Sequence, residues 1–194
     1  VVLMVSRFDH CLVDLLYRWR SGELRMDPVA IIANHPRETY AHIDFGGIPF
    51  HCLPVARETR MEQEAQAWEV IRSANTDLVV LARYMRILPA EIIANYRSKI
   101  INIHPSLLPY FPGANPYKQA YDSGVRVHGC TAHFVTEELD EGPVILQDVF
   151  HINVGSDTVE DVKRKGLELE GHVLSKAMQL FLDEELVVVE GKVI

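Results

Sequence analysis

Short apolar runs that alternate with helical segments constrain the fold of this chain more than any other feature. The run Asp77–Ala82, DLVVLA, is apolar without a break after its first residue, as expected of a strand that is buried on both faces of a parallel sheet. Apolar residues recur at helical spacing between such runs. The other strand-like runs of this half lie at residues 1–5, 28–33 and 48–54, and the helical segments at 11–20 and 61–74. This alternation predicts an α/β fold with a mostly parallel, doubly wound sheet.

The second half of the chain predicts the remaining strands of this sheet and the helices that pack on it. Its expected elements are a short helix from Pro89, a strand at 99–104, a helix at 115–123, strands at 126–135 and 143–152, a long helix at 159–182 and a hairpin around Gly191. A chain of 194 residues with 48% hydrophobic residues can bury one substantial core, and no shift in composition marks a second. We therefore expect a single Rossmann-like α/β domain over residues 1–194, with a long C-terminal helix and a small hairpin.

The helix expected at 61–74 has a narrow apolar face. Met61, Ala65, Trp68 and Ile71 fall at helical spacing, so they share one side of a helix. We expect this side to be buried.

Charge and hydropathy argue against two classes of partner. The formal net charge is −8, whereas nucleic-acid-binding surfaces are built from lysine and arginine. No apolar run approaches the roughly 20 residues that a membrane-spanning helix needs. We therefore expect a soluble protein that binds neither nucleic acid nor membrane, while a homo-oligomer remains open.

The cysteine pattern indicates a reducing compartment. Cys11, Cys52 and Cys130 are odd in number, scattered, and form no CxxC pair. This pattern favours reduced, buried thiols and a cytoplasmic location.

Three polar residues could form a catalytic site at the carboxyl edge of the sheet. Asn102 and His104 lie two residues apart at the end of an apolar run, so both side chains leave the same face of a strand. Asp140 lies in the loop between the two later strands. Acyl chemistry uses an amide that donates to the oxyanion, an imidazole that moves protons, and a carboxylate that orients the imidazole or activates the attacking group. Spacing alone does not bring the three together, and an Asn-x-His at a strand end is also typical of a structural pair.

His128, Cys130 and His133 are residue types that bind metals, but their spacing argues against a site. On a regular strand residues 128 and 130 share a face, and residue 133 points to the other. One compact site would need a bulge, so we expect no metal.

The turn after the first strand argues against a phosphate site. Phosphate-binding turns use glycines, so that backbone N–H groups can approach the anion. This turn is Ser6-Arg7-Phe8-Asp9-His10, without glycine. Asp9 would compete with a phosphate for the positive end of the following helix, although Arg7 offsets part of that charge.

Two blocks of sequence resemble a known family. IINIHPSLLPYFPGANPYKQAYDSGV and GCTAHFVTEELDEGPVILQ are similar to the 10-formyltetrahydrofolate-dependent formyltransferases, whose Asn, His and Asp match Asn102, His104 and Asp140. The resemblance runs from the first strand to the long last helix and implies the formyltransferase fold. SRFDHCLVDLLYRW at residues 6–19 is most similar to the deformylase branch, which hydrolyses 10-formyltetrahydrofolate to formate and tetrahydrofolate and feeds one-carbon and purine metabolism.

The resemblance also implies roles for individual residues. The formyl group would lie between Asn102, His104 and Asp140, with water attacking the formyl carbon. The pterin end of the folate would lie against two segments, and no bound cofactor is implied besides this substrate. The implied folate-binding residues are Met85, Arg86, Ile87 and Leu88 in one segment and Val135, Thr136, Glu137 and Glu141 in the other.

Two features depart from the deformylase branch. Deformylases usually have a second His where this chain has Pro105, and they usually carry an N-terminal ACT-type regulatory domain, which this chain does not contain. The alternatives are transfer of the formyl group to glycinamide ribonucleotide, transfer to methionyl-tRNA as in longer relatives that bind tRNA, or a folate-binding module without catalysis. An intact set of Asn102, His104 and Asp140 counts against the last alternative.

Overall fold

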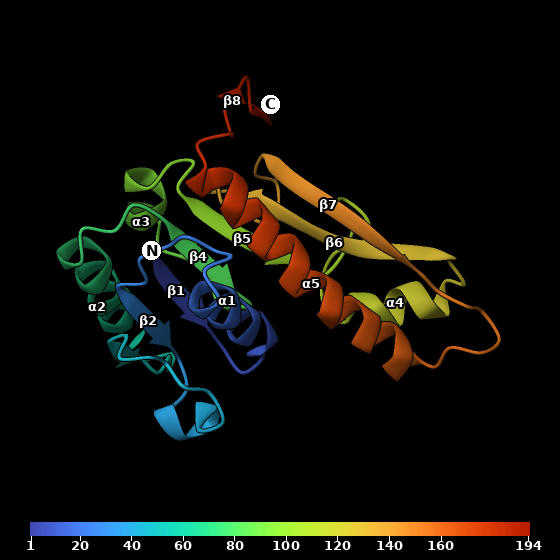
Figure 1. Ribbon diagram of the computed structural model, residues 1–194, viewed down its shortest axis with the longest axis horizontal. Helices are drawn as coiled ribbons and strands as arrows, with labels where there is room; N and C mark the ends of the chain where they lie inside the picture. The colour runs from blue at the N-terminus through green and yellow to red at the C-terminus, as the bar shows by residue number, and fades with distance from the viewer.

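One seven-stranded sheet organises the computed structural model, which describes residues 1–194 (Figure 1). The strands lie in the order β3-β2-β1-β4-β5-β6-β7. The first five of these strands run parallel, and β6 and β7 are antiparallel additions at one edge. Their bounds are β1 Val2–Val5, β2 Ala30–Ala33, β3 Phe50–Cys52, β4 Val79–Ala82, β5 Ile100–His104, β6 Val127–Phe134 and β7 Val144–His151. The predicted doubly wound, mostly parallel sheet is therefore confirmed.

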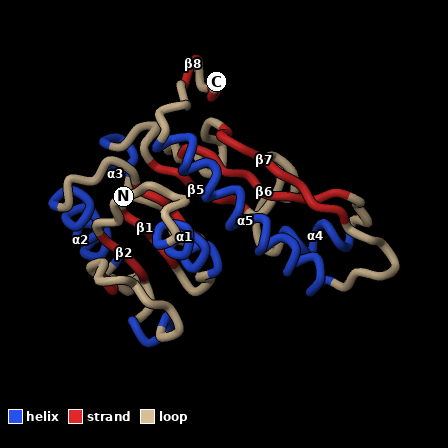
Figure 2. The backbone as a smooth tube through the Cα atoms, viewed as in Figure 1, coloured by secondary structure: helices blue, strands red, loops and turns tan.

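Helices cover both faces of this sheet (Figure 2). The long helix α5 and helix α1 pack on one face, where they share the larger apolar core with the sheet. Helices α2 and α3 pack on the other face, over a second apolar cluster. The bounds are α1 His10–Arg20, the 3-10 helix η1 Arg37–Tyr40, α2 Arg60–Ser73, α3 Ala90–Asn95, α4 Pro116–Asp122, α5 Val159–Leu182, β8 Val188–Val189 and β9 Lys192–Val193. None of these helices combines the length and the apolar character needed to cross a membrane.

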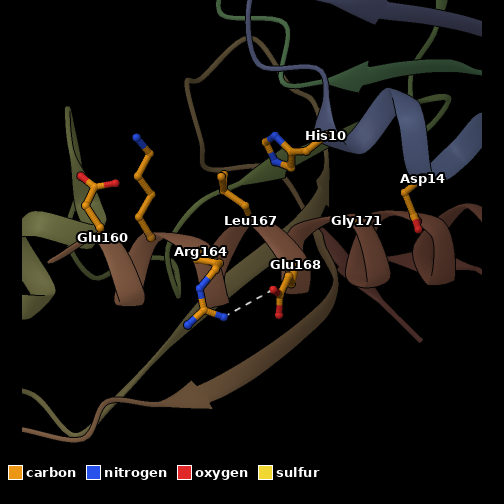
Figure 3. A pocket seen from close by; sticks show the side chains of 8 residues that line it. His10, Asp14, Glu160, Arg164, Leu167, Glu168 and Gly171 are labelled. Atoms are coloured by element: carbon orange, nitrogen blue, oxygen red, sulfur yellow. Dashed lines mark ion pairs between the residues drawn. The ribbon is translucent and has the colours of Figure 1, made fainter. Parts of the chain in front are cut away.

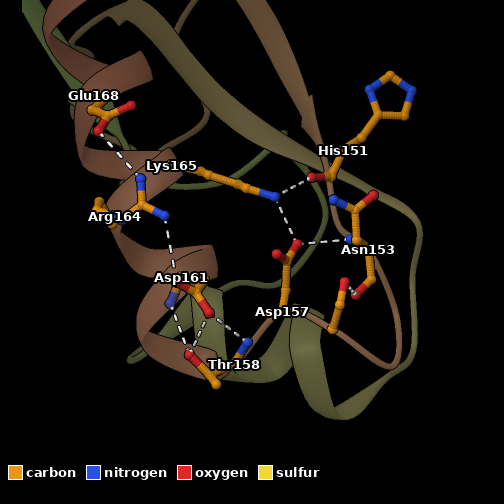
Figure 4. Close-up of polar contacts among 9 residues, drawn as sticks. His151, Asn153, Asp157, Thr158, Asp161, Arg164, Lys165 and Glu168 are labelled. Carbon is orange, nitrogen blue, oxygen red and sulfur yellow. Dashed lines mark hydrogen bonds and ion pairs between the residues drawn. The ribbon is translucent and has the colours of Figure 1, made fainter.

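Helix α5 begins at Val159 because Thr158 caps it. The Thr158 hydroxyl accepts a hydrogen bond from the backbone N–H of Asp161 at 3.2 Å, and the Asp161 carboxylate accepts one from the Thr158 N–H at 2.9 Å. This reciprocal arrangement satisfies two backbone donors at the helix start. Lys165 then ties the helix to the sheet, since its Nζ lies 3.2 Å from the carbonyl oxygen of His151 at the end of β7 and 2.7 Å from the carboxylate of Asp157 (Figure 4).

The buried face of α2 differs from the one expected. Met61 is 85% exposed and Ala65 is also exposed. The buried residues of the helix are Gln63, Ala67 and Ile71. Gln63 is a polar residue, but its Nε2 donates to the buried hydroxyl of Tyr84 at 3.0 Å, and this bond offsets the cost of its burial. The prediction was therefore right for Ile71 and wrong for Met61 and Ala65, while Trp68 is partly buried against the apolar cluster on this face.

The cysteines follow the expected pattern in part. Cys11 and Cys130 are free thiols without solvent exposure, inside the core beneath α1 and α5. Cys52 is also free but exposed, because it ends β3, the edge strand of the sheet. The expectation of buried thiols was therefore wrong for Cys52.

Gly166 in α5 makes room for the ring of Tyr117 in α4. A Cβ at position 166 would lie 2.1 Å from Cε1 of that ring, far inside van der Waals contact. We therefore expect Gly166→Ala to lower the free energy of unfolding by about 1–3 kcal/mol through overpacking. Gly171→Ala is the matched control, because its Cβ would meet Asp14 at 3.3 Å and needs only a small adjustment. Thermal unfolding should give a clearly lower Tm for the first variant alone, and equal Tm values would contradict this packing.

Candidate active site

The structure brings together the three residues expected to carry the chemistry. Asn102 and His104 lie on β5, near the middle of the sheet, and Asp140 lies in the loop between β6 and β7. Nδ1 of His104 is 3.4 Å from Oδ2 of Asp140. His104 is 8% exposed and Asp140 is partly buried, so their contact lies at the edge of the interior.

His133 is a fourth member of the cluster, which the sequence interpretation did not include. The antiparallel register of β5 and β6 sets His133 opposite Asn102, and Nδ2 of Asn102 lies 3.2 Å from Nε2 of His133. His133 Nδ1 lies 3.0 Å from the carbonyl oxygen of Phe134. Since a carbonyl only accepts, Nδ1 carries the proton, and Nε2 is free to accept from the Asn102 amide. The second amide hydrogen of Asn102 remains available to a substrate oxygen.

Electrostatics at the cluster fix the charge of two groups. The hydrogen-bonding contact with His104 is the largest cause that holds the pKa of Asp140 below its ordinary value, and the charges of His104 and His133 act in the same direction against burial. Burial lowers the pKa of His133. At neutral pH Asp140 is therefore a carboxylate and His133 is neutral. Nε2 of His104 is buried and makes no hydrogen bond within the chain, so a polar atom of a bound substrate would satisfy it.

Thr131 on β6 holds the loop that follows His104. The Thr131 hydroxyl donates to the carbonyl oxygen of Ser106 at 2.8 Å and accepts from the backbone N–H of Leu108 at 3.1 Å. Gln147 on β7 donates to the same hydroxyl at 2.9 Å. Thr131 and Ser106 are completely buried. These bonds fix the chain directly after β5 and so limit the movement of His104.

The two segments expected to bind folate border one apolar cluster. Leu88 is 6% exposed and belongs to the cluster beneath α2 and α3, against which Val135 also packs. Met85 and Ile87 are 59% and 60% exposed. The remaining members are Arg86, Glu137 and Glu141, which are exposed, and Thr136, which is partly exposed. Met85 and Ile87 therefore form a pair of exposed apolar side chains in the turn after β4.

His128 and Cys130 do not join His133 in a metal site. Regular alternation along β6 sends His133 to the face opposite to that of His128 and Cys130, where it meets Asn102 and Asp140. His128 instead packs edge-on against the rings of Phe111, Tyr117 and Phe150. Its Nε2 lies 3.2 Å from the carbonyl oxygen of Pro105.

Burial of His128 makes the stability of the fold depend on pH. Burial is the largest cause that lowers its pKa from the usual 6.5. As the pH falls below about 6.5, the unfolded chain takes up a proton that the folded chain excludes, so the free energy of unfolding decreases. We expect the Tm to fall between pH 7.5 and 5.5, and to fall less in His128→Phe, which keeps the ring packing without the titration. An equal fall in both proteins would contradict this account.

A second polar cluster lies beneath α5. Ligand-type atoms of His10, Cys11 and Glu170 lie within 4.8 Å of one another. Glu170 already faces three cationic or proton-donating groups: Nε2 of His10 at 2.6 Å, Nε of Arg83 at 3.6 Å, and the hydroxyl of Tyr117. Burial raises the pKa of the Cys11 thiol. A guanidinium at this distance and a protonated thiol both disfavour a metal ion.

A hollow of about 570 Å³ lies between α1 and α5, on the outer side of this cluster (Figure 3). Arg164 and Glu168, one turn apart on α5, both line it and form an ion pair at 3.7 Å. Asn102, His104 and Asp140 do not line it. The residues that line it are His10, Asp14, Glu160, Lys163, Arg164, Leu167, Glu168 and Gly171.

The turn after β1 carries the carboxylate expected there. Asp9 directly precedes α1, but it makes no capping hydrogen bond, and its Oδ2 lies 2.8 Å from Nε2 of His42. The Ser6 hydroxyl accepts a hydrogen bond from the backbone N–H of Met85 at 3.1 Å. Ser6 therefore joins the turn after β1 to the turn after β4, and Asp9 keeps negative charge at the helix start.

Known proteins share this fold and much of this sequence. Over all 194 residues the chain is 45% identical to the formyltetrahydrofolate deformylase of Synechocystis sp., of which it covers 67%. The crystal structure of a formyltetrahydrofolate deformylase from Pseudomonas syringae pv. tomato matches the whole chain with a TM-score of 0.95 and 40% identity, and the chain covers 64% of it. Glycinamide ribonucleotide transformylase 1 from Symbiobacterium toebii matches 99% of the chain with a TM-score of 0.86 and 35% identity, and is 91% covered.

The resemblance drawn from the sequence is therefore confirmed at the level of the family. The chain spans about two thirds of the length of the deformylases that it resembles. Residues 1–178 match the formyl transferase family, so the chain belongs to it.

Proposed function

We propose that this protein hydrolyses 10-formyltetrahydrofolate to formate and tetrahydrofolate. The observation that carries the proposal is the convergence of Asn102, His104 and Asp140 at the carboxyl end of β5. Relatives named formyltetrahydrofolate deformylase support it, because the one from Synechocystis sp. is 45% identical, whereas the transformylase from Symbiobacterium toebii is 35% identical.

In the proposed reaction, a water oxygen attacks the formyl carbon and a tetrahedral intermediate forms. Asp140 takes a proton from the attacking water, and the C–N10 bond then breaks. Asp140 passes that proton to N10 as N10 leaves, and the formic acid that is released with the new oxygen ionises to formate. Asp140 has the ionised form that a base needs, because its contact with His104 holds its pKa below the ordinary value.

The negative oxygen of the tetrahedral intermediate needs hydrogen-bond donors. The free amide hydrogen of Asn102 supplies one donor. Nε2 of His104, which has no partner within the chain, is the second group to which the substrate oxygen can bind. His133 holds the Asn102 amide by accepting its other hydrogen. A water nucleophile also agrees with the state of the two core thiols, since burial raises the pKa of Cys11 and of Cys130 and keeps both protonated.

The folate itself would bind along the apolar cluster beside β4. We propose that Met85, Arg86, Ile87 and Leu88 contact one side of the pterin. The second proposed set is Val135, Thr136, Glu137 and Glu141, on the loop that also carries Asp140. Placement of Asp140 and half of the folate contacts on one loop would couple substrate binding to the position of the carboxylate.

We further propose that the protein works in the cytoplasm on a free folate substrate, with no bound cofactor or metal. The buried free thiols of Cys11 and Cys130 agree with a reducing compartment.

Transfer of the formyl group to glycinamide ribonucleotide is the second candidate. It is favoured by the fold shared with a transformylase at a TM-score of 0.86 and by the transferase-like Pro105 after His104. The carboxylate of Asp9 at the start of α1 counts against a phosphate ligand there.

One assay separates the two candidates. Purified protein is incubated with 10-formyltetrahydrofolate, with and without glycinamide ribonucleotide, and formate and tetrahydrofolate are both measured. Hydrolysis predicts equal amounts of the two products without any acceptor. Tetrahydrofolate that forms only when the ribonucleotide is present would overturn the proposal in favour of the transferase.

A further inference from the structure

Glu170 is a fully buried carboxylate that the proposed hydrolysis does not use. It lies in α5 with no solvent exposure. Nε2 of His10 is 2.6 Å from its Oε2, and the hydroxyl of Tyr117 donates to its Oε1. A buried charge is costly unless it is paired, and the cationic group that faces it is Arg83, with Nε at 3.6 Å.

Arg83 is buried in an unusual way. It is 8% exposed, and its backbone φ of 63° lies in the left-handed region that favours glycine, although the residue carries a long side chain. Its guanidinium carbon lies 5.2 Å from the centre of the Phe8 ring. Nε and Nη1 are buried and make no hydrogen bond. The side chain is therefore held by charge and ring contacts, at a conformational cost that a glycine would avoid.

The position of Arg83 is next to the proposed site. It directly follows β4, and the parallel register pairs Leu81 of β4 with Asn102 of β5. Continuation of this register sets Arg83 level with His104, the last residue of β5. β4 also borders β1 on its other side, so Arg83 lies at the point where the strand order reverses, which is where open α/β sheets bind their ligands.

Arg83 and its neighbours in sequence turn to opposite faces of the sheet. The Tyr84 side chain packs beneath α2, in the cluster that borders the proposed folate segments. The left-handed backbone at Arg83 instead sends its side chain toward Phe8 and Glu170, on the α1 and α5 face. If the folate occupies the first face, Arg83 fills the second. The hollow lined by His10 lies on this second face too, between α1 and α5 (Figure 3), and Glu170 contacts both His10 and Arg83.

We propose that Arg83 is a specificity-determining residue. It occupies the α1 and α5 side of the formyl group, from which an amine acceptor would approach, and leaves water as the only nucleophile small enough to reach the formyl carbon. This inference rests on the proposed hydrolysis. An amine acceptor would need to attack the same formyl carbon, so that the C–N10 bond breaks, a new C–N bond forms, and the proton lost by the amine is taken up at N10. The guanidinium blocks that approach by its volume and repels an ammonium group by its charge, while Glu170 holds it in place.

The test measures how the formyl group divides between water and an amine. Wild type, Arg83→Gly and Arg83→Asn are incubated with 10-formyltetrahydrofolate and a fixed excess of glycinamide, and both formate and N-formylglycinamide are measured. Glycine and asparagine both accept the left-handed backbone at position 83. We expect the ratio of formylated amine to formate to rise about tenfold or more in both variants. Arg97→Gly, which removes an exposed arginine after α3, is the matched control and should keep the wild-type ratio.

The ratio does not depend on the amount of folded enzyme, so partial loss of stability leaves the result interpretable. An unchanged ratio in both variants would overturn the inference. Loss of both products in variants whose circular dichroism matches wild type would also overturn it, because a residue that only blocks the acceptor is not needed for formate release. Failure of the wild type to release formate without an amine is a separate outcome, which would refute the proposed hydrolysis itself.

Discussion

Replacement of Asp140 by asparagine should lower kcat by about 10²–10⁴-fold while the protein still binds tetrahydrofolate. The lost group is the proposed base, and positioned acid–base groups contribute rate factors of this size. Asparagine has the same shape as aspartate and tolerates the φ of 57° found at this position, so the loop should keep its conformation. Steady-state formate release gives kcat, and a fluorescence titration with tetrahydrofolate gives Kd.

The control for this variant is Glu138→Gln, which removes an exposed carboxylate from the same loop. It changes the charge of the loop equally but leaves the contact between His104 and Asp140 intact, so its kcat should match wild type. Asp140→Asn with wild-type kcat would show that the carboxylate is not the base. A large rise in its Kd for tetrahydrofolate would show instead that the loop has lost its folded form.

Replacement of Asn102 by alanine should lower kcat by about 10²–10³-fold, the usual cost of removing one oxyanion donor. The loss should fall on kcat more than on KM, because the amide binds the developing oxyanion rather than the ground-state formyl group. Asn95→Ala is the matched control, since the Asn95 amide only donates to the carbonyl oxygen of Glu91 at the surface of α3.

The Tm of Asn102→Ala separates a catalytic role of Asn102 from a structural one. Without Asn102, Nε2 of His133 loses its partner, but the Nδ1 bond to Phe134 remains. The β5–β6 register should therefore survive, and the Tm should fall far less than activity does. Equal kcat values for Asn102→Ala and wild type would remove Asn102 from the proposed machinery.

Local patterns in the sequence predicted the sheet and the long helix because these elements depend on nearby residues. β4 is apolar on both faces and is buried on both faces, and α5 spans the expected residues 159–182 because Thr158 and Asp161 cap it locally. Burial of Gln63 in place of Met61 could not be predicted in this way. It depends on the Tyr84 hydroxyl, which comes from another part of the chain.

The candidate site could be predicted only in part for the same reason. Asn102 and His104 share a strand, and their common face follows from the two-residue period. His133 enters the site through the antiparallel pairing of β5 with β6, which is not visible in a single strand. The contact of Arg83 with Glu170 joins the end of β4 to the middle of α5, so only the folded chain reveals it.

The origin of the second oxygen in formate tests the central claim most directly. A single turnover of 10-formyltetrahydrofolate in ¹⁸O-labelled water, without any amine, should release formate that carries one labelled oxygen, at the rate at which tetrahydrofolate forms. Heat-inactivated protein gives the background. Labelled formate at the enzymatic rate would establish water as the nucleophile that attacks the formyl carbon. Unlabelled formate, or no formate until an amine is added, would contradict hydrolysis at the Asn102, His104 and Asp140 site.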